Sequence, residues 1–253
     1  MLIPSFQNLE YETHEGVKKI ACINFVKLDD FKSIKSNLEN TICEIVNGQI
    51  LASDLSTTKK VIKDLISGKT SIQKHGLVAE FFVYFVLKEL GFVQESVFSN
   101  LEETSMKKGF DGLYSKNDVI WLSESKSGNT NGLIHKAKLQ EAFTDLKNKL
   151  EGKSANNPFR NAACHMLIAR KSPSTNLLYS IKKLSEDYTM RKFHELDQFC
   201  VVPASTLFVN HAQSEEDIKL DILNLINKMK YCKILIICID NAIFDDFMTY
   251  IGI

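Results

Sequence analysis

Three charged residues near the middle of the chain have the types and spacing needed to bind a metal ion and hydrolyse a phosphate ester. Asp111 is followed by Glu124 and Lys126, which enclose Ser125. Two nearby carboxylates can hold Mg²⁺, an ion that prefers oxygen ligands and keeps several waters. The Ser125 carbonyl could supply a further oxygen. A metal-bound water loses its proton more readily, and Lys126 beside it would stabilise developing negative charge.

The segment that joins these residues predicts a β-hairpin. Two apolar-aromatic runs flank the polar turn formers Ser115–Asp118, a pattern typical of paired strands. If the turn is symmetric about Asn117–Asp118, facing residues have numbers that sum to 235, and Asp111 faces Glu124. Strand side chains alternate between faces, so Lys126 shares the face of Glu124. A three-residue loop would shift the pairing by one and move Asp111 to the other face.

A surface ion pair at the end of a hairpin is the alternative to a catalytic site. Glu-x-Lys alone is a weak signal, because any solvated strand face can supply it. The acid expected on the facing strand makes the arrangement more specific, and we therefore favour the site.

A buried helix is predicted for Gly76–Leu90, which is apolar nearly all round. Glu80 lies within it, and a carboxylate in such a helix needs a partner. Glu80 could serve as an auxiliary catalytic carboxylate, meeting a second metal or a water near Asp111. It could equally form a salt bridge, or be stabilised by the helix dipole near the N-terminus.

Positive charge is concentrated around the carboxylates. Residues 105–171 contain 12 Lys and Arg against 6 Asp and Glu, although the whole chain has a net charge of zero. This excess favours a polyanionic substrate, and a solvated lysine-rich helix is the alternative. Within a helix expected over Leu133–Leu150, Lys136 and Lys147 border the apolar stripe and are candidate phosphate contacts. Lys138 and Lys149 are expected to lie away from that stripe.

The remaining pattern predicts an α/β fold with a mixed sheet. A strand is expected over Ala162–Arg170, which would place Arg170 and Lys171 at a strand end as further nucleic-acid contacts. The continuous apolar run Ile234–Ile239 is typical of a central parallel strand. Other expected strands are Lys18–Lys27, Phe92–Phe98, Phe199–Val202 and Leu207–Val209, and other expected helices are Ser53–Ile66, Leu177–Leu184, Glu215–Lys230 and Phe244–Ile253. We divide the chain into an N-terminal extension, residues 1–68, for docking a partner, and a main domain, residues 69–253.

Other chemistries find little support. The six cysteines form no CxxC pair and are expected to be reduced thiols. No zinc-type histidine pairing occurs, and His75 and His135 are expected at the surface or at helix ends. Ser67-Gly-Lys-Thr70 lacks the glycine that a phosphate-binding loop requires at position 63. With no long apolar segment or leader-like start, we expect a cytoplasmic protein that does not enter a membrane.

These motifs together resemble the PD-(D/E)xK nuclease core, with Phe110-Asp111 in place of the Pro-Asp pair. The order of Glu80, Gly109-Phe-Asp-Gly112 and Glu124-Ser-Lys126 is similar to the HamA family, the nuclease subunits of Hachiman anti-phage systems, and to the related AbpA. The resemblance covers roughly residues 75–171. It implies a restriction-endonuclease-like core and Mg²⁺ or Mn²⁺ as cofactor. Nothing in the sequence suggests a base-reading module, so cleavage should depend little on DNA sequence. The resemblance also implies a heterodimer with a superfamily 2 helicase, HamB, which would supply the ATP-driven step. A non-catalytic DNA-binding subunit and a restriction or repair nuclease remain alternatives.

Overall fold

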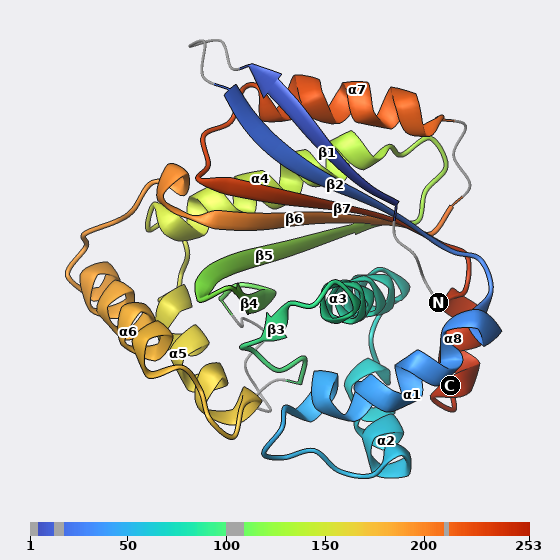
Figure 1. Ribbon diagram of the computed structural model, residues 1–253. Helices are drawn as coiled ribbons and strands as arrows, with labels where there is room; N and C mark the ends of the chain where they lie inside the picture. The colour runs from blue at the N-terminus through green and yellow to red at the C-terminus, as the bar shows by residue number, and fades with distance from the viewer. Residues whose placement is uncertain (1–4, 13–17, 100–108, 210–212) are drawn as a thin grey trace.

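A mixed β-sheet forms the centre of the protein (Figure 1). The computed structural model describes residues 5–12, 18–99, 109–209 and 213–253. In spatial order, the strands of this part are β1 (Ser5–Glu12), β2 (Lys18–Leu28), β7 (Lys233–Asn241), β6 (Cys200–Leu207), β5 (Val119–Gly128), β4 (Gly112–Lys116) and β3 (Val93–Gln94). The central strands β2, β7, β6 and β5 run parallel, while β1 and β4 run antiparallel to their neighbours. The α/β class with a mixed sheet is therefore confirmed.

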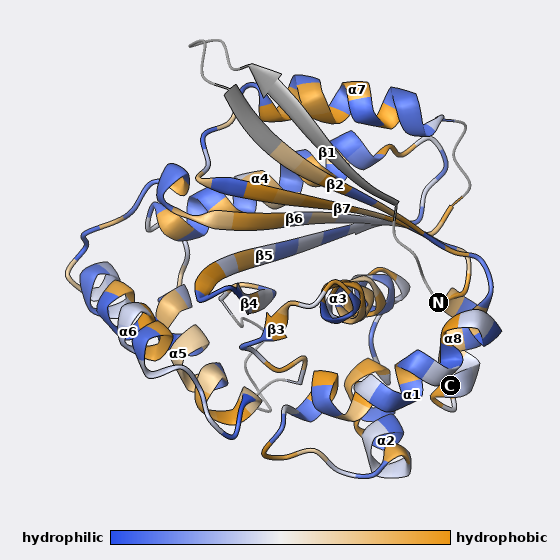
Figure 2. Ribbon diagram, in the orientation of Figure 1, coloured by the Kyte–Doolittle hydropathy of each residue, from blue (hydrophilic) through white to orange (hydrophobic). Residues whose placement is uncertain are grey.

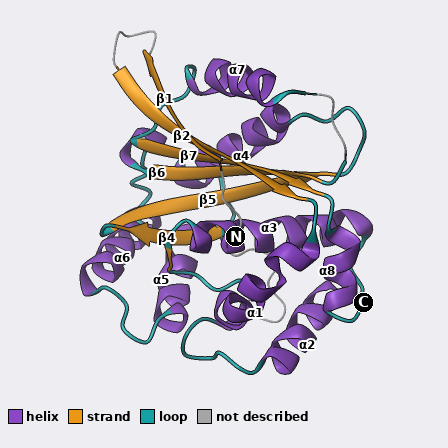
Figure 3. Cartoon of the chain, turned by 45° about the vertical axis from the view of Figure 1, so that its right-hand side comes forward, coloured by secondary structure: helices purple, strands orange, loops and turns teal. Residues whose placement is uncertain are grey.

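Helices cover both faces of the sheet (Figures 1 and 3). They are α1 (Phe31–Asn47), α2 (Leu55–Ile66), α3 (Ser71–Glu89), α4 (His135–Leu150), α5 (Pro158–Ala169), α6 (Thr175–Thr189), α7 (Glu215–Ile226) and α8 (Phe244–Tyr250). Buried side chains of α1, α2, α3 and α8 form one apolar cluster with the sheet. Those of α4, α5, α6 and α7 form a second cluster on the opposite face. The two faces of β5 thus meet different helices.

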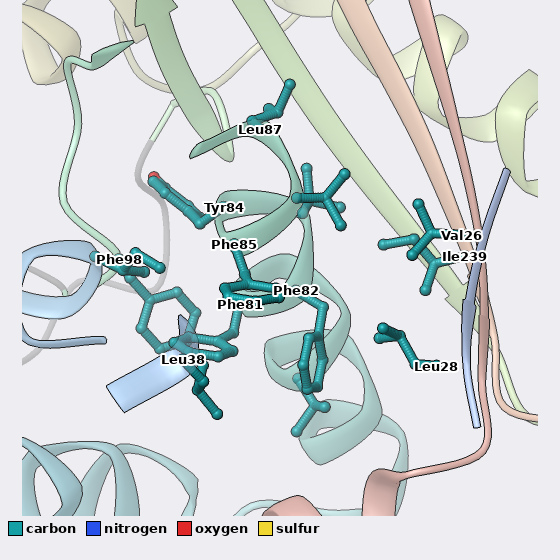
Figure 4. Close-up of a cluster of buried hydrophobic side chains, with 14 of the residues drawn as sticks. Val26, Leu28, Leu38, Phe81, Phe82, Tyr84, Phe85, Leu87, Phe98 and Ile239 are labelled. Carbon is teal, nitrogen blue, oxygen red and sulfur yellow. The ribbon is translucent and has the colours of Figure 1, made fainter. Parts of the chain in front are cut away.

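Helix α3 fills the first cluster (Figure 4). Thr70 caps its N-terminus in a capping box with Gln73. The residues from Val78 to Leu87, apart from Glu80, are buried, as the all-round apolar sequence predicted. Figure 2 shows the helix as largely hydrophobic in colour. Burying several aromatic side chains contributes a large part of the hydrophobic stabilisation, at roughly 1.5–3 kcal/mol for each fully buried side chain.

The β4–β5 hairpin has the predicted register. Leu113 pairs with Leu122 and Gly112 with Ser123, so the numbers of facing residues sum to 235. The turn residues Asn117 and Asp118 have φ values of 51° and 58°. Two successive positive φ angles are the signature of a type I′ turn, whose twist matches that of the flanking strands. This short turn fixes the pairing along the whole hairpin.

The predicted strand over Ala162–Arg170 is wrong, because this segment lies in helix α5. Asn157 caps that helix by accepting hydrogen bonds from the main-chain N–H groups of Phe159 and Arg160, and Pro158 occupies the first turn. The buried residues of α5 recur every three or four positions, at Phe159, Ala162, Met166 and Ala169. The helical period and the cap outweigh the apolar composition that had suggested a strand.

A single strand occupies the region in which two were predicted. Strand β6 includes most of the predicted Phe199–Val202, continues through Pro203 and ends at Leu207, so most of the second predicted strand, Leu207–Val209, lies outside it. A proline lacks an N–H group and is unusual inside a sheet. The pairing of β6 with β7 accordingly omits Val202 and Pro203, while the pairing with β5 is continuous.

The N-terminal segment continues the same sheet. Strand β2 lies beside β7, and helix α1 packs near α3. Its role in docking a partner stays a prediction. All six cysteines are free thiols, as expected, and Cys164 is exposed on α5. Among the described residues, no helix is both long and apolar enough to cross a lipid bilayer.

Candidate functional site

Asp111 lies just before β4, where its carboxylate reaches the backbone of β5. Strand β4 begins at Gly112 opposite Ser123, so the strand pairing stops short of Ser125. The Ser125 N–H instead donates to Oδ2 of Asp111 at 2.9 Å. A residue in an antiparallel strand points its N–H and C=O to the same side. The Ser125 carbonyl therefore faces the same end of β4 as the Asp111 carboxylate.

The main chain of Asp111 is held by helix α3. The Tyr84 hydroxyl donates to the Asp111 carbonyl oxygen at 2.8 Å and lies 2.8 Å from the Ser96 hydroxyl. Because Tyr84 has one proton to give, Ser96 donates to Tyr84 and accepts from the Leu113 N–H at 2.8 Å. These bonds connect α3, the segment after β3 and the start of β4. They restrict the position of Asp111 independently of its side chain.

Gly112 permits this close packing. A Cβ atom at this position would lie 2.5 Å from the Tyr114 ring, which is fully buried below it. A larger residue at position 112 would collide with the Tyr114 ring and distort strand β4. The glycine beside Asp111 is therefore required by sterics and carries no chemistry of its own.

Glu124 lies on β5 with only 2% of its side chain exposed. Its Oε1 atom accepts from Lys126 at 3.2 Å, and its Oε2 atom pairs with Lys149 from α4. Lys126 also pairs with Asp145 on α4. Two ion pairs thus bridge the strand and the helix, and each oxygen of the buried carboxylate has an ammonium partner.

The surroundings of Glu124 and Lys126 shift the pKa of each. Burial, followed by the nearby negative charge of Asp111, raises the pKa of Glu124 to about 7, against the lowering effects of Lys149 and Lys126. Burial lowers the pKa of Lys126, but Glu124, Asp145 and Asp111 outweigh it and raise the pKa above its usual value. Lys126 is therefore a cation at neutral pH, suited to stabilising negative charge and not to accepting a proton.

The structure brings together the three residues predicted as the centre of the site. Asp111 lies directly before β4 and binds the Ser125 N–H, while Glu124 and Lys126 lie two apart on β5 and contact each other. Glu80 lies on α3, whose buried side chains pack on the other face of the sheet. Burial raises the pKa of the Tyr84 and Tyr114 hydroxyls, and the nearby charge of Glu80 raises both further. Glu80 thus lies near the tyrosine that holds Asp111, and its part as an auxiliary catalytic carboxylate stays a prediction.

The predicted phosphate contacts already have acidic partners. Lys136 pairs with Asp221 of α7 at 2.9 Å, and Lys147 pairs with Glu151 at 3.7 Å. These two carboxylates lie outside the group of ion pairs around Glu124, so both contacts with phosphate stay predictions.

Arg170 follows α5, where its guanidinium donates to the fully buried Glu95 at 2.8 Å. The Ser115 hydroxyl donates to the same carboxylate oxygen at 2.7 Å. Lys171 is exposed, and its main-chain N–H donates to Gln49. Arg170 therefore joins α5 to the hairpin, while its contact with nucleic acid stays a prediction.

Sequence reasoning missed Asp145 and Lys149. The two residues lie four apart on α4, which places them on one side of the helix. Lys149 had been expected away from the packed face, yet its ammonium reaches the buried Glu124. The available signal was the i, i+4 pair of opposite charges beside the apolar stripe. It could not be assigned, because the packing of α4 sets its rotation against β5.

The donor atoms suit a hard divalent cation. The Asp111 carboxylate, the Glu124 carboxylate and the Ser125 carbonyl are all oxygen ligands of the kind that Mg²⁺ and Mn²⁺ accept. The described residues contain no group of three or more His, Cys, Asp or Glu side chains placed to hold a metal. A cation here would rest on two carboxylates, a carbonyl and waters. It would also have to displace at least one lysine from Glu124.

A second set of hydrogen-bonded polar residues, where α4 meets the sheet, has the residue types of a hydrolase triad. His135 at the start of α4 lies 2.9 Å from the Ser205 hydroxyl and 3.0 Å from Asp240. His135 lies at a helix end, one of the two expected places, but its side chain is buried and does not lie at the surface. Ser205 is fully buried within a central strand and cannot meet a substrate as a nucleophile. These hydrogen bonds satisfy buried polar groups between α4, β6 and β7.

Comparison with known proteins agrees with the order of these motifs. A family model described as HamA matches residues 3–248 of the 253-residue chain. A search of curated proteins finds no match. The family match includes the N-terminal segment, the hairpin and the C-terminal strands, and so extends well beyond the motifs at residues 75–171.

Proposed function

The chain belongs to the HamA family, a component of the Hachiman defence system, and on that premise we propose that it is a metal-dependent DNA endonuclease. The observation that carries this proposal is the convergence of Asp111, Glu124 and Lys126 at one end of the β4–β5 hairpin. Two acids, a carbonyl and a lysine in this order fit the PD-(D/E)xK type of core. The mixed sheet with helices on both faces is compatible with that fold.

Each residue has a definable part in the reaction. Asp111, Glu124 and the Ser125 carbonyl would hold Mg²⁺ or Mn²⁺, which when bound supplies an acidified water and neutralises charge on the phosphate. Lys126, kept charged by its neighbours, would stabilise the negative charge that develops on the phosphate during hydrolysis. Asp145 would orient Lys126 from α4.

DNA is the proposed substrate because the site lies within the basic part of the sequence. Charge contacts of this kind give affinity without reading bases. Cleavage should therefore depend little on sequence. As a Hachiman component, the protein would act as an effector against phage. A superfamily 2 helicase subunit would complete a heterodimer and restrain the nuclease until abnormal DNA is present.

The proposal is tested by DNA cleavage with the purified full-length chain, alone and with its helicase partner, in Mg²⁺ and in EDTA. Asp111→Asn and Glu124→Gln should each abolish cleavage. Asp118→Asn is the matched control, because Asp118 lies at the opposite end of the same hairpin in a turn conformation that asparagine tolerates. Cleavage in EDTA, or cleavage by Glu124→Gln at the wild-type rate, would refute the proposal.

A second candidate is a non-catalytic DNA-binding subunit. The pairing of both Glu124 oxygens with lysines favours it, because such a network can be purely structural. The double variant Glu124→Ala, Lys126→Ala separates the two functions. Lost cleavage with retained DNA binding supports the nuclease, whereas undiminished anti-phage protection in cells supports the binding subunit.

A further inference from the structure

The buried carboxylate of Glu124 is contacted by two ammonium groups, one at each oxygen. Lys126 pairs with one oxygen and Lys149 with the other, while Lys126 has a second acid in Asp145. A single well-placed ammonium would balance a buried carboxylate, and burying a second one costs desolvation free energy. The position of Lys149 therefore calls for a reason beyond stabilising Glu124.

The two lysines differ in how they are held. Lys126 is tied to Glu124 and to Asp145, so it keeps a partner if Glu124 changes its contacts. Among the described residues, the carboxylate with which Lys149 pairs is Glu124. Its side chain comes from the last turn of α4 and is 18% exposed, so part of it is accessible to solvent. A lysine has a long flexible stem and can move its ammonium by several ångströms through rotamer changes alone.

Glu124 cannot bind a divalent cation and Lys149 through the same oxygen. The cation would bring two positive charges to a group of three acids (Asp111, Glu124, Asp145) and two lysines. The net charge of this group is −1 with Lys149 in place, and becomes +1 when the cation binds. Binding of the cation would release an ammonium from Glu124. The positive charge gained would also attract one phosphodiester group of DNA.

On the basis of the proposed function, we propose that Lys149 is a further substrate-binding residue: it neutralises Glu124 in the metal-free protein and contacts a phosphate of the DNA once a divalent cation has displaced it. The exchange makes metal binding and DNA binding cooperative. It also gives the metal-free protein a stable site in which no carboxylate is left buried without a partner.

The test compares Lys149→Gln with Lys147→Gln in the full-length protein. Lys147 lies two residues away, is 59% exposed and pairs with Glu151, so it controls for the loss of one charge from α4. Mn²⁺ binding to the metal-free protein is measured by calorimetry without DNA. We expect Lys149→Gln to bind Mn²⁺ about tenfold more tightly than the wild type, as removal of one competing neighbouring charge allows. Lys147→Gln should match the wild type.

Affinity for DNA is then measured in Ca²⁺, which occupies such sites without rapid turnover. Lys149→Gln should lose about tenfold in DNA affinity while Lys147→Gln loses little, in keeping with one phosphate contact. Thermal melting gives an independent reading that does not require activity. Lys149→Gln should melt at a lower temperature than the wild type in EDTA, and Mn²⁺ should raise its melting temperature by more than it raises that of the wild type.

Equal or weaker Mn²⁺ binding by Lys149→Gln would overturn this role for Lys149. If the wild type binds Mn²⁺ and Glu124→Gln does not, such a result leaves the proposed nuclease intact. If the wild type itself binds neither Mn²⁺ nor Mg²⁺, the proposed function fails together with the inference.

Discussion

The carboxylate of Asp111 accepts a hydrogen bond from the main-chain N–H of Ser125 at 2.9 Å, so an acid on one strand is fixed to the backbone of the next. This bond replaces the strand pairing that ends at Gly112. It holds one oxygen of Asp111 against β5, and it places the carboxylate beside the Ser125 carbonyl. The same contact thus finishes the hairpin and orients a proposed metal ligand.

Replacing Asp111 with asparagine should separate its structural role in the hairpin from its proposed role as a metal ligand. The amide oxygen that Asp111→Asn introduces can still accept from the Ser125 N–H, so the free energy of unfolding should change by only about 1 kcal/mol.

Cleavage should fall at least about 100-fold, because a weakened metal site loses several kcal/mol of charge stabilisation. The measurements are chemical denaturation and single-turnover cleavage, with Asp118→Asn as control. Wild-type cleavage by Asp111→Asn would show that this acid is no ligand.

The stability of the metal-free protein should depend on pH through Glu124. Its pKa is raised to about 7 in the folded protein from an ordinary value of 4.5, so the folded state holds this proton more tightly than the unfolded state. Stability should then be highest below pH 4.5 as far as this group is concerned. It should fall as the pH rises to about 7, by on the order of 3 kcal/mol.

Glu124→Gln removes that dependence. In EDTA, the melting temperature of the variant should rise relative to that of the wild type as the pH increases from 5 to 8. Parallel curves for the two proteins over this range would mean that Glu124 does not titrate there.

Tyr84 should act on catalysis by positioning Asp111. Tyr84→Phe removes the hydroxyl that holds the Asp111 carbonyl and the Ser96 hydroxyl, and should cost about 1–2 kcal/mol of stability. We expect kcat to fall several-fold while KM for DNA is nearly unchanged, since no substrate contact is lost. Tyr179→Phe, at an exposed position on α6, is the control. A change confined to KM would place Tyr84 among the substrate contacts instead.

Arg170 should matter for stability. Arg170→Ala leaves the fully buried Glu95 without its cation and should cost roughly 3–5 kcal/mol. Arg160→Ala, on the exposed side of the same helix, should change stability by less than about 0.5 kcal/mol. Thermal denaturation compares the two variants. Unaltered stability of Arg170→Ala, with weakened DNA binding, would support the phosphate contact suggested by its charge.

The features that could be predicted are those set by local sequence. The hairpin register followed from a two-residue turn and alternating side chains, and it correctly gave the pairing from Lys116–Val119 to Gly112–Ser123. Helix α3 followed from its length and apolar character. These signals lie within a few residues of the structures they determine, so tertiary packing had little to add.

The features that were missed depend on contacts between distant segments. Lys149 reaches Glu124 because α4 is rotated so that its last turn lies beside β5. The apolar stripe of α4 does not specify this rotation. His135 is buried because β6 and β7, far along the chain, supply Ser205 and Asp240. The prediction of a strand at Ala162–Arg170 was wrong because apolar composition was given more weight than the helix cap at Asn157.

The strand order has a consequence for synthesis of the protein. Strand β5 ends at Gly128, but β6, which flanks it on the side away from the hairpin, begins 72 residues later at Cys200. On its other side, β6 pairs with β7, which follows still later in the chain at Lys233–Asn241. Translation must therefore reach Leu207 before both sides of β5 can be paired, and a nascent chain carries Asp111 and Glu124 long before they can lie in a complete sheet.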